Sequence, residues 1–424
     1  MLRMNDAAAP HAQTPPASFA HLLWLAFALS LGAAVSLGVT RFAYGLLLPP
    51  MREDLGWSYT LAGAMNTFNA LGYLIGALLT PRLLRRHGAA HVLLAGAWLA
   101  TGFMALTGFF TQAPVLLAQR LLAGLASALV FVAGGLLAAR LGALHATRAG
   151  LLLGIYYGGT GWGIVLSAVG VPLVLAQAAN EAHGWAWAWW MLALLCLVAT
   201  LLMHAPVQSL QRLTETPAPA ATGPASEGAP VPHIWRALGF GLAGYTLFGV
   251  GYIGYMTFVI ALLREQGLGA AAITLFYALL GLAVVASSRL WAGLLDRSRG
   301  GQALALLNAL LGVATVLPVL SSAWGVVLAS GLMFGAVFLS VVASTTAMVR
   351  HNLPPAQWAG GIGAFTIVFA FGQIVGPTVV GWIADGPGGL ARGLVLSALA
   401  LWCGALLAWR QKPLASRAHG QVLT

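Results

Sequence analysis

Twelve long apolar segments constrain the fold of this chain more than any other feature of the sequence. A helix needs about 20 mostly apolar residues to cross the hydrocarbon core of a bilayer, and a helix satisfies its own backbone groups there. Apolar residues make up 60% of the chain and charged residues only 7%, against about 25% charged in soluble domains. The sequence therefore predicts an all-α membrane protein with twelve transmembrane helices. The predicted spans lie near residues 20–48, 58–80, 90–110, 115–138, 150–174, 185–204, 236–262, 270–294, 301–320, 324–348, 358–383 and 389–409.

A constant spacing of 211 residues relates the two halves of the chain. It aligns residues 38–44 with residues 249–255, and it pairs Gly124 with Gly335 and Gly161 with Gly372. We interpret the chain as two copies of one unit, with pseudo-symmetric six-helix bundles at residues 19–204 and 233–410. Repeated halves with a substrate site between them are typical of secondary transporters.

The basic residues predict how the helices are oriented. The net charge of +11 would suggest nucleic acid only if a soluble domain carried a basic face, whereas here the basic residues lie at the ends of spans. With both termini cytoplasmic, 14 Lys and Arg residues fall in inner loops and tails, and three fall in outer loops (Arg52, Arg264 and Arg392). The positive-inside rule then predicts that both termini are cytoplasmic. We expect the chain to lie in the cytoplasmic membrane of a bacterium.

Three segments lack the apolar periodicity of the spans. Residues 205–232 are rich in Pro, Ala, Thr and Ser and predict a flexible cytoplasmic linker between the halves. Residues 1–18 predict a disordered cytoplasmic N-terminus, and residues 411–424 a cytoplasmic tail. We expect no cleaved signal peptide, because the first apolar run starts late and is long enough to span.

Several short motifs carry a resemblance to a known family. The loop sequence from Gly293 to Arg297, the Arg120 to Gly124 pair and the Gly376-Pro377 pattern resemble signatures of the major facilitator superfamily. Residues 38–51, 71–76 and 248–258 are similar to its YbfB-type branch. The resemblance implies a transporter whose first and fourth helices line a central cavity. One position departs from the pattern, since Arg85 occupies the place of an aspartate in the first-half loop.

Charged side chains inside spans are candidates for function, because each costs several kcal/mol at the bilayer centre. Three arginines qualify, Arg41, Arg120 and Arg289, and no acidic residue lies in any predicted span. A guanidinium can hold a carboxylate or phosphate through two hydrogen bonds, so we predict that Arg41 binds an anionic substrate and that Arg120 serves coupling or gating. The alternative is that they bond helix carbonyls or extend to the interface.

Asp296, with Arg297, is the predicted gating pair of the second-half loop. Because the first-half loop lacks its aspartate, Asp296 is the better candidate for charge pairing at the inner face. We expect Arg289 to lie at the interface near Asp296.

Neutral polar residues in the spans favour a polar cavity. Amides and hydroxyls within a bilayer need partners, and these could be substrate atoms or neighbouring helices, where a hydrogen bond is worth about 0.6 to 2 kcal/mol. Together they favour an amphipathic ligand with a polar or acidic group. The predicted substrate-binding residues besides Arg41 are Tyr44, Asn66, Asn69, Tyr156, Tyr252, Tyr255 and Gln373.

The sequence offers no support for an enzyme. It has no His, Cys and carboxylate cluster with metal-ligand spacing and no glycine-rich loop followed by Lys-Ser/Thr, so we expect no metal, no cofactor and no ATP-driven step. The predicted function is secondary active, proton-linked transport of a small organic anion or amphipathic metabolite by a monomer. The alternatives are a multidrug efflux transporter and, in another class, a non-transporting membrane sensor or assembly partner.

Overall fold

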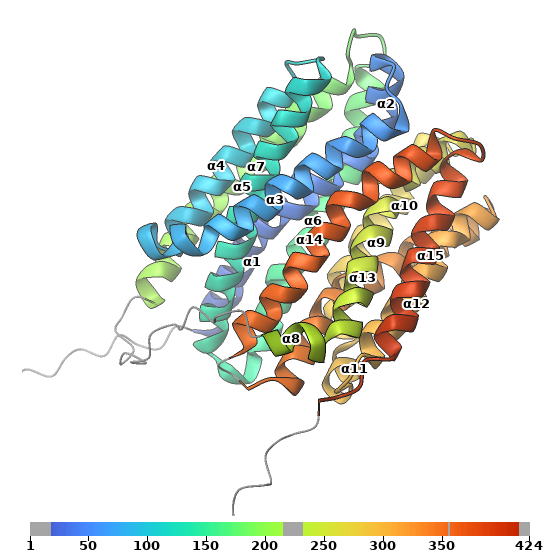
Figure 1. Cartoon of the computed structure of the whole chain (residues 1–424). Coiled ribbons are helices and arrows are strands. Elements are labelled where there is room, and N and C mark those ends of the chain that lie inside the picture. Colours follow the sequence, from blue (N-terminus) through green and yellow to red (C-terminus); the bar gives the residue numbers. More distant parts are fainter. Residues whose placement is uncertain (1–17, 215–231, 355–356, 415–424) are drawn as a thin grey trace, which may run out of the picture.

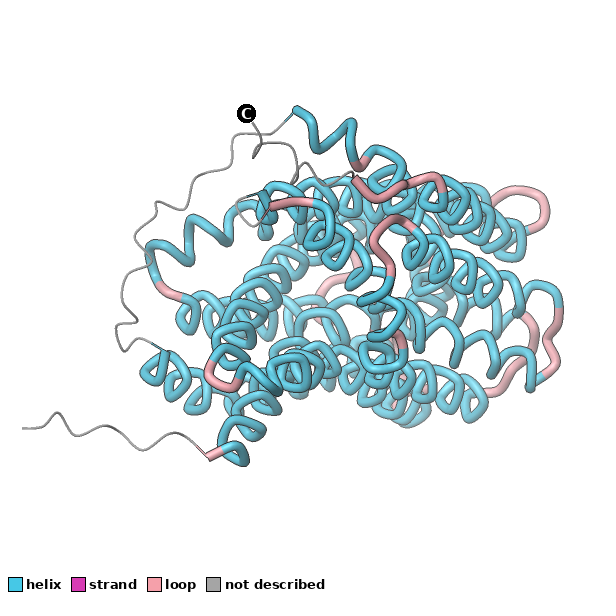
Figure 2. Tube along the Cα trace, turned by 90° about the horizontal axis from the view of Figure 1, so that it is seen from below, coloured by secondary structure: helices cyan, strands magenta, loops and turns pink. Residues whose placement is uncertain are grey.

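A computed structural model describes residues 18–214, 232–354 and 357–414 of the chain. Within these residues the secondary structure is helical, and short loops join the helices (Figure 2). Figure 1 shows two groups of helices side by side, the first half in blue to green and the second in yellow to red.

The first half contains six spans. The first span is one continuous run of three elements, because a π-helix joins two α-helices without a break. The elements are α1 (Phe19–Ala33), η1 (Ala34–Phe42), α2 (Tyr44–Leu55), α3 (Tyr59–His87), α4 (Ala89–Thr107), α5 (Ala113–Ala143), the short 3₁₀ turn η2 (Ala146–Arg148), α6 (Ala149–Gln177) and α7 (Trp185–Thr214).

The second half repeats this arrangement with six spans and two short helices. The elements are α8 (Pro232–Ala237), α9 (Gly239–Glu265), α10 (Ala270–Leu290), α11 (Ala292–Arg297), α12 (Gln302–Leu320), α13 (Trp324–Asn352), α14 (Trp358–Ala384) and α15 (Gly389–Trp409).

Eleven helical segments of the described chain are long and apolar enough to cross a membrane. The twelfth span is α3, which has 29 residues but contains Asn66 and Asn69 in its middle and three basic residues in its last turn. The prediction of an all-α membrane protein built from two six-helix halves is confirmed.

The predicted linker began too early. Residues 205–214 continue α7 through Pro206, because Val207 and Leu210 are fully buried and pack into the apolar core of the first half. The rest of the predicted linker, residues 215–231, lies outside the described residues, as do residues 1–17 and 415–424. Gln411, in the predicted tail, is bonded to the second half, since its amide nitrogen donates to the Ala237 carbonyl at 2.9 Å.

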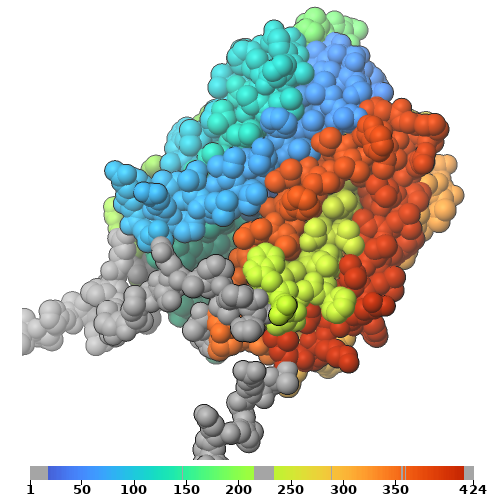
Figure 3. Space-filling view, in the orientation of Figure 1, coloured from blue at the N-terminus to red at the C-terminus, as the bar shows by residue number. Residues whose placement is uncertain are grey.

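The two halves meet along α3 and α14, which lie against each other on the face shown in Figure 3. Glycines permit this contact, because a Cβ on Gly63 would lie 2.2 Å from the Pro377 carbonyl oxygen and one on Gly381 would lie 2.3 Å from the Tyr59 carbonyl oxygen. Gly161 of α6 approaches α10 in the same way. Small residues at helix interfaces are a common means of close packing in membranes.

Hydrogen bonds between the halves gather toward one end of the molecule, which we call the sealed end. It carries the loops at residues 56–58, 178–184, 266–269 and 385–388, and it is the upper end in Figure 1. Thr67 donates to the Ile374 carbonyl at 2.7 Å, and Tyr277 donates to the Phe42 carbonyl at 2.8 Å. These contacts hold the sealed end shut.

Candidate functional site

Arg41 lies in the π-helix η1, whose nine residues are all buried. The wider turn forms where Gly38 packs directly on Gly163, and the Thr40 hydroxyl donates to the Val35 carbonyl at 2.5 Å. π-Helical turns are frequent at functional sites. Here the turn carries a guanidinium into the middle of the span.

The Arg41 guanidinium is only partly satisfied. Its residue is 2% exposed, yet its Nε and Nη2 atoms have no hydrogen-bond partner in the described part of the chain. The guanidinium lies over the ring of Tyr73 at 5.5 Å, and it interacts electrostatically with Tyr252 of the second half. A buried charge without full hydrogen bonding is costly, so this side chain is suited to an anionic partner.

Arg120 of α5 has more partners, and of its guanidinium nitrogens only Nε is buried without one among the described residues. Its Nη1 donates to the Thr40 carbonyl at 2.8 Å, and its Nη2 donates to Asn66 Oδ1 at 3.1 Å. Rings of Tyr44 and Trp189 lie 5.1 and 5.6 Å from its guanidinium. This is the hydrogen bonding to a helix carbonyl that we considered as the alternative to a gating role, and it fixes the π-helix that carries Arg41.

The two predicted asparagines of α3 join Arg120 to both halves. Asn66 donates to the Thr257 hydroxyl of α9 at 2.8 Å, and Asn69 donates to the Arg120 carbonyl at 3.1 Å. A polar chain therefore runs from Thr40 through Arg120 and Asn66 to Thr257. It connects η1, α5, α3 and α9 at the boundary between the halves.

Three predicted substrate tyrosines bond neighbouring helices instead of facing Arg41. Tyr44 donates to the Ala62 carbonyl and Tyr156 to the Phe131 carbonyl, each at 2.8 Å, and the Tyr255 hydroxyl lies 2.7 Å from the Ser330 hydroxyl. In this conformation their hydroxyls have helix partners, which is the interhelical role weighed in the sequence analysis.

Tyr252 and Gln373 do lie at the site. Tyr252 donates to Gln373 Oε1 at 2.8 Å, which ties α9 to α14. Tyr252 also stacks on Phe338, whose ring centre lies 5.6 Å from that of Phe42, the residue after Arg41. The structure thus brings Tyr252 and Gln373 together next to the π-helix that carries Arg41.

The site includes aromatic residues that sequence reasoning missed. Tyr73 follows Asn66 by seven residues and so shares its face of α3, a spacing that could have revealed it. The second half contributes a set of nearly parallel rings that we call the aromatic wall, and its Phe338 contacts Phe42, the residue after Arg41. The wall consists of Tyr245, Phe248 and Tyr252 of α9, Phe338 of α13 and Phe369 of α14.

Asp296 and Arg297, the predicted gating pair, lie at the end of α11. Both side chains are exposed, and in the part of the chain that the structure covers Asp296 takes part in no ion pair. The charge pairing predicted for Asp296 at the inner face is absent from this conformation, in which the halves are bonded at the sealed end.

Asp385 forms a contact between the halves that the sequence did not indicate. It follows α14, and its carboxylate accepts from the backbone nitrogens of Tyr59 and Thr60 at 2.6 and 2.9 Å and from the Thr60 hydroxyl at 2.6 Å. It thereby caps the N-terminus of α3 in the other half, where a carboxylate is favoured. Burial raises the pKa of Asp385, but the Thr60 and Tyr59 hydrogen bonds and the Arg52 charge outweigh it and hold that pKa below its ordinary value.

Tyr59 strengthens the same contact. Its hydroxyl donates to the Glu265 carboxylate of α9, and the Arg52 guanidinium lies 3.8 Å from its ring centre. We call Asp385, Tyr59, Thr60 and Glu265 the latch, because all four join one half to the other at the sealed end.

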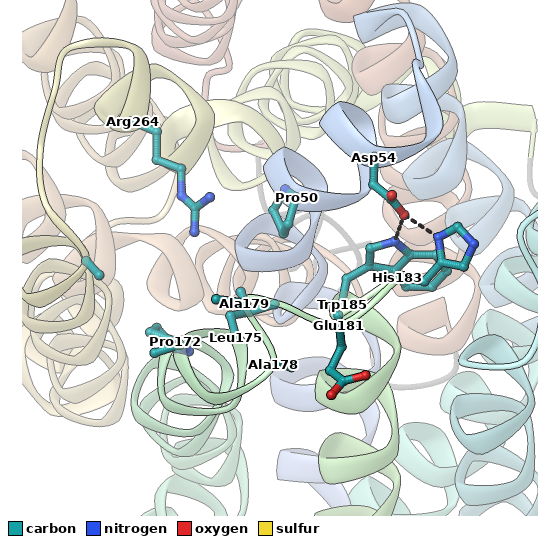
Figure 4. Close-up of a pocket in the computed structure, with 13 residues that line it drawn as sticks. Pro50, Asp54, Pro172, Leu175, Ala178, Ala179, Glu181, His183, Trp185 and Arg264 are labelled. Atoms are coloured by element: carbon teal, nitrogen blue, oxygen red, sulfur yellow. Dashed lines mark hydrogen bonds and ion pairs between the residues drawn. The ribbon is translucent and has the colours of Figure 1, made fainter.

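A cavity of about 380 Å³ opens at the sealed end, next to the loop at residues 178–184 (Figure 4). Both halves line it, with Pro50 and His183 from the first and Arg264 from the second. Asp54 accepts from His183 Nδ1 at 2.6 Å and from Trp185 Nε1 at 2.5 Å. Trp185 and His183 thus fix the acidic side chain of Asp54 at this end of the molecule.

Comparison with known proteins identifies the fold and the family. The bacterial homologue of the human lysosomal transporter Spinster, in an inward-facing, unoccupied conformation, superposes with a TM-score of 0.68 at 14% identity, covering 93% of this chain and 97% of that one. The nucleoside transporter NupG gives a TM-score of 0.68 at 12% identity, covering 92% and 97%.

A relative from Streptomyces lividans, named a chloramphenicol resistance protein, is 26% identical over 383 residues, 87% of this chain and 92% of its own. The family model of the uncharacterised MFS-type transporter YbfB matches residues 33–409. Proteins of this family and fold are transporters and not enzymes. The chain therefore belongs to the YbfB-type family of the major facilitator superfamily.

Proposed function

We propose that this secondary transporter moves a small organic anion or amphipathic metabolite, with Arg41 as the anion ligand. The observation that carries the proposal is the guanidinium of Arg41, which is buried while two of its nitrogens lack partners. A carboxylate would supply the missing acceptors and offset the cost of burying the charge. The Tyr252 and Gln373 pair, together with Tyr73, would border the bound molecule.

The transport cycle in this proposal is alternating access between two conformations. The halves are bonded at the sealed end, and the distribution of basic residues assigns that end to the outer side of a bacterial cytoplasmic membrane, with both termini in the cytoplasm. Rocking of the two halves would break the latch and expose Arg41 to the outer side.

Proton coupling fits the charge of such a substrate. A monovalent anion that moves together with one proton carries no net charge across the membrane, so the membrane potential does not oppose its entry. A proton gradient alone could then drive accumulation.

The test begins with a thermal-shift screen of small carboxylates on purified protein. Uptake of the stabilising compounds is then measured in proteoliposomes with and without an imposed pH gradient, and protein-free liposomes correct for passive diffusion. We expect hits to stabilise the wild type but not Arg41→Gln, and an acidic exterior to accelerate uptake until a protonophore is added.

Two outcomes would contradict separate parts of the proposal. Equal stabilisation of Arg41→Gln would exclude the anion site. Protein-dependent uptake that ignores the protonophore would exclude proton coupling. Binding without any uptake would instead indicate the non-transporting sensor.

Multidrug efflux is the second candidate, because the Streptomyces lividans relative is named for chloramphenicol resistance. The site also contains many aromatic rings and few polar groups, which suits an apolar drug. Expression in a strain that lacks its own drug pumps should raise chloramphenicol tolerance if this candidate is right, and unchanged tolerance would argue against it.

A further inference from the structure

We infer that the molecule bound at Arg41 carries an aromatic ring next to its anionic group. The inference rests on the proposed function of Arg41 as anion ligand, and it adds the chemical class of the rest of the substrate. Its basis is the position of the aromatic wall relative to the unsatisfied guanidinium.

The wall presents flat, nearly parallel surfaces. The Phe369 ring centre lies 4.9 Å from that of Tyr245, 5.4 Å from that of Phe248 and 5.5 Å from that of Tyr252, at interplanar angles of 22°, 9° and 18°. Offset stacking of this kind is a favoured geometry of aromatic pairs. A further ring can extend such a stack wherever one face remains uncovered.

Two rings near Arg41 keep exposed surface. Phe369 of α14 and Tyr73 of α3 are partly buried, whereas Arg41, Phe248 and Tyr252 are buried. Phe369 and Tyr73 belong to opposite halves, on two helices that pack against each other. A molecule bound between the halves can therefore contact Tyr73 of the first half and Phe369 of the second half.

Phe338 and Tyr252 link the wall to the segment that carries the charge. Tyr252 stacks on Phe369 and on Phe338, and the Phe338 ring centre lies 5.6 Å from that of Phe42, the residue after Arg41. The Arg41 guanidinium lies 5.5 Å from the centre of the Tyr73 ring. A carboxylate on Arg41 would thus have its carbon skeleton beside Tyr73 and Phe369. A planar ring fits between such surfaces, and its stacking would add about 2- to 10-fold in affinity over a saturated ring of the same size.

Three probes of matched shape test the ring and the charge separately. They are 3-phenylpropanoate, 3-cyclohexylpropanoate, which has no aromatic ring, and 3-phenylpropanamide, which has no charge. Dissociation constants are measured by calorimetry on the purified full chain. We expect the aromatic acid to bind about 2- to 10-fold more tightly than the saturated acid and about tenfold or more tightly than the amide.

A matched pair of variants on α14 locates the effect. Phe369→Leu should bring the ratio between the two acids close to one, and Phe371→Leu should leave it unchanged, because Phe371 is 60% exposed on the outside of the same helix. Melting temperatures of both variants check that each is folded.

The outcomes separate this inference from the proposed function. If the two acids bind equally while the amide binds weakly, the aromatic inference is wrong and the anion site stands. If the amide binds as well as the acids, the anion site itself is wrong. Failure of the aromatic acid to bind at millimolar concentration, or a ratio unchanged by Phe369→Leu, would also overturn the inference.

Discussion

The side chains of Arg41 and Arg120 are 2% and 1% exposed, but their hydrogen-bond partners differ. Arg120 donates to a main-chain carbonyl and to an asparagine, so the protein itself satisfies much of its guanidinium. Arg41 has two nitrogens without acceptors. Residue type and burial are equal here, and only the hydrogen-bond partners separate the cation that neighbouring helices satisfy from the one that we propose binds an anion.

Substitutions at Arg41 should affect binding more than stability. Arg41→Gln should lower affinity for 3-phenylpropanoate about tenfold or more, because a charge-assisted hydrogen bond is worth roughly 1.5 to 3 kcal/mol. Arg41→Lys should also weaken binding, since an ammonium cannot make the two-point contact of a guanidinium. Calorimetry measures both, with the exposed Arg289→Gln as control, and wild-type affinity in Arg41→Gln would return Arg41 to a structural role.

Substitutions at Arg120 should affect stability more than the Arg41 variants do. Arg120→Leu leaves the Thr40 carbonyl and the Asn66 amide oxygen buried without these donors, at about 1 to 3 kcal/mol for each unsatisfied group. Thermal melting of the purified protein should show a clear loss for Arg120→Leu and little change, or a gain, for Arg41→Gln, which removes an unpaired buried charge. The reverse order would contradict the assignment of the two residues.

At the scale of elements, the latch joins the end of α14 to the start of α3. The Asp385 carboxylate accepts from backbone nitrogens in the first turn of α3, as the side chain of an N-cap residue does, although Asp385 belongs to the other half. A cap of this kind contributes on the order of 1 kcal/mol, enough to shift the balance between two conformations several-fold. The latch can therefore favour the closed conformation of the sealed end and still allow that end to open during transport.

Asp385→Ala should increase the fraction of molecules whose sealed end is open. Asp385→Asn should increase that fraction by a smaller amount, because asparagine can still accept from the α3 nitrogens. The measurement is the labelling rate of a cysteine placed at Thr67, in a background without Cys196 and Cys403. Thr67 belongs to α3 and faces α14, where its hydroxyl donates to the Ile374 carbonyl. Equal rates in wild type and Asp385→Ala would show that the latch has no role in closure.

The pH dependence of the latch follows from the direction of its pKa shift. The pKa of Asp385 is lowered from 3.8 in the sealed conformation, so the ionised form stabilises that conformation at higher pH, and this contribution is lost only as the pH falls below 3.8. The labelling rate at Thr67, divided by the rate of a fully exposed control cysteine at the same pH to correct for the thiolate fraction, should then be constant from pH 8 to pH 5. An increase within that range would mean that another group titrates at the sealed end.

At the scale of the whole molecule, the two halves are bonded at one end, and Asp296 at the other end is exposed and without an ion pair among the described residues. This arrangement is that of a transporter closed at the sealed end and open at the Asp296 end. We expect Asp296 to gain a charged partner only when the Asp296 end closes.

Asp296→Asn should therefore favour the conformation described here. Distances between spin labels on the two halves, measured at the Asp296 end, should shift toward the open population in the variant, and labels at the sealed end should remain close. An unchanged distribution would make Asp296 a surface residue without a gating role.

The orientation of the molecule in the membrane is tested with single cysteines on exposed, described residues. Glu181 lies in a loop of the sealed end and Arg212 near the end of α7. A membrane-impermeant maleimide should label Glu181→Cys in intact cells and Arg212→Cys only in inverted vesicles. The opposite pattern would place the termini outside the cytoplasm.

The sequence by itself determined the spans, the two halves and the family, because apolar runs, repeat spacing and loop motifs are properties of contiguous residues. It also determined that Arg41 and Arg120 would be costly to bury. Only the tertiary structure decided which of them has partners, that residues 205–214 extend α7, and that Tyr73 lies against Arg41. Asp385 reaches α3 across 326 residues of sequence. Such contacts depend on how the two halves pack, and no local pattern specifies which atoms meet there.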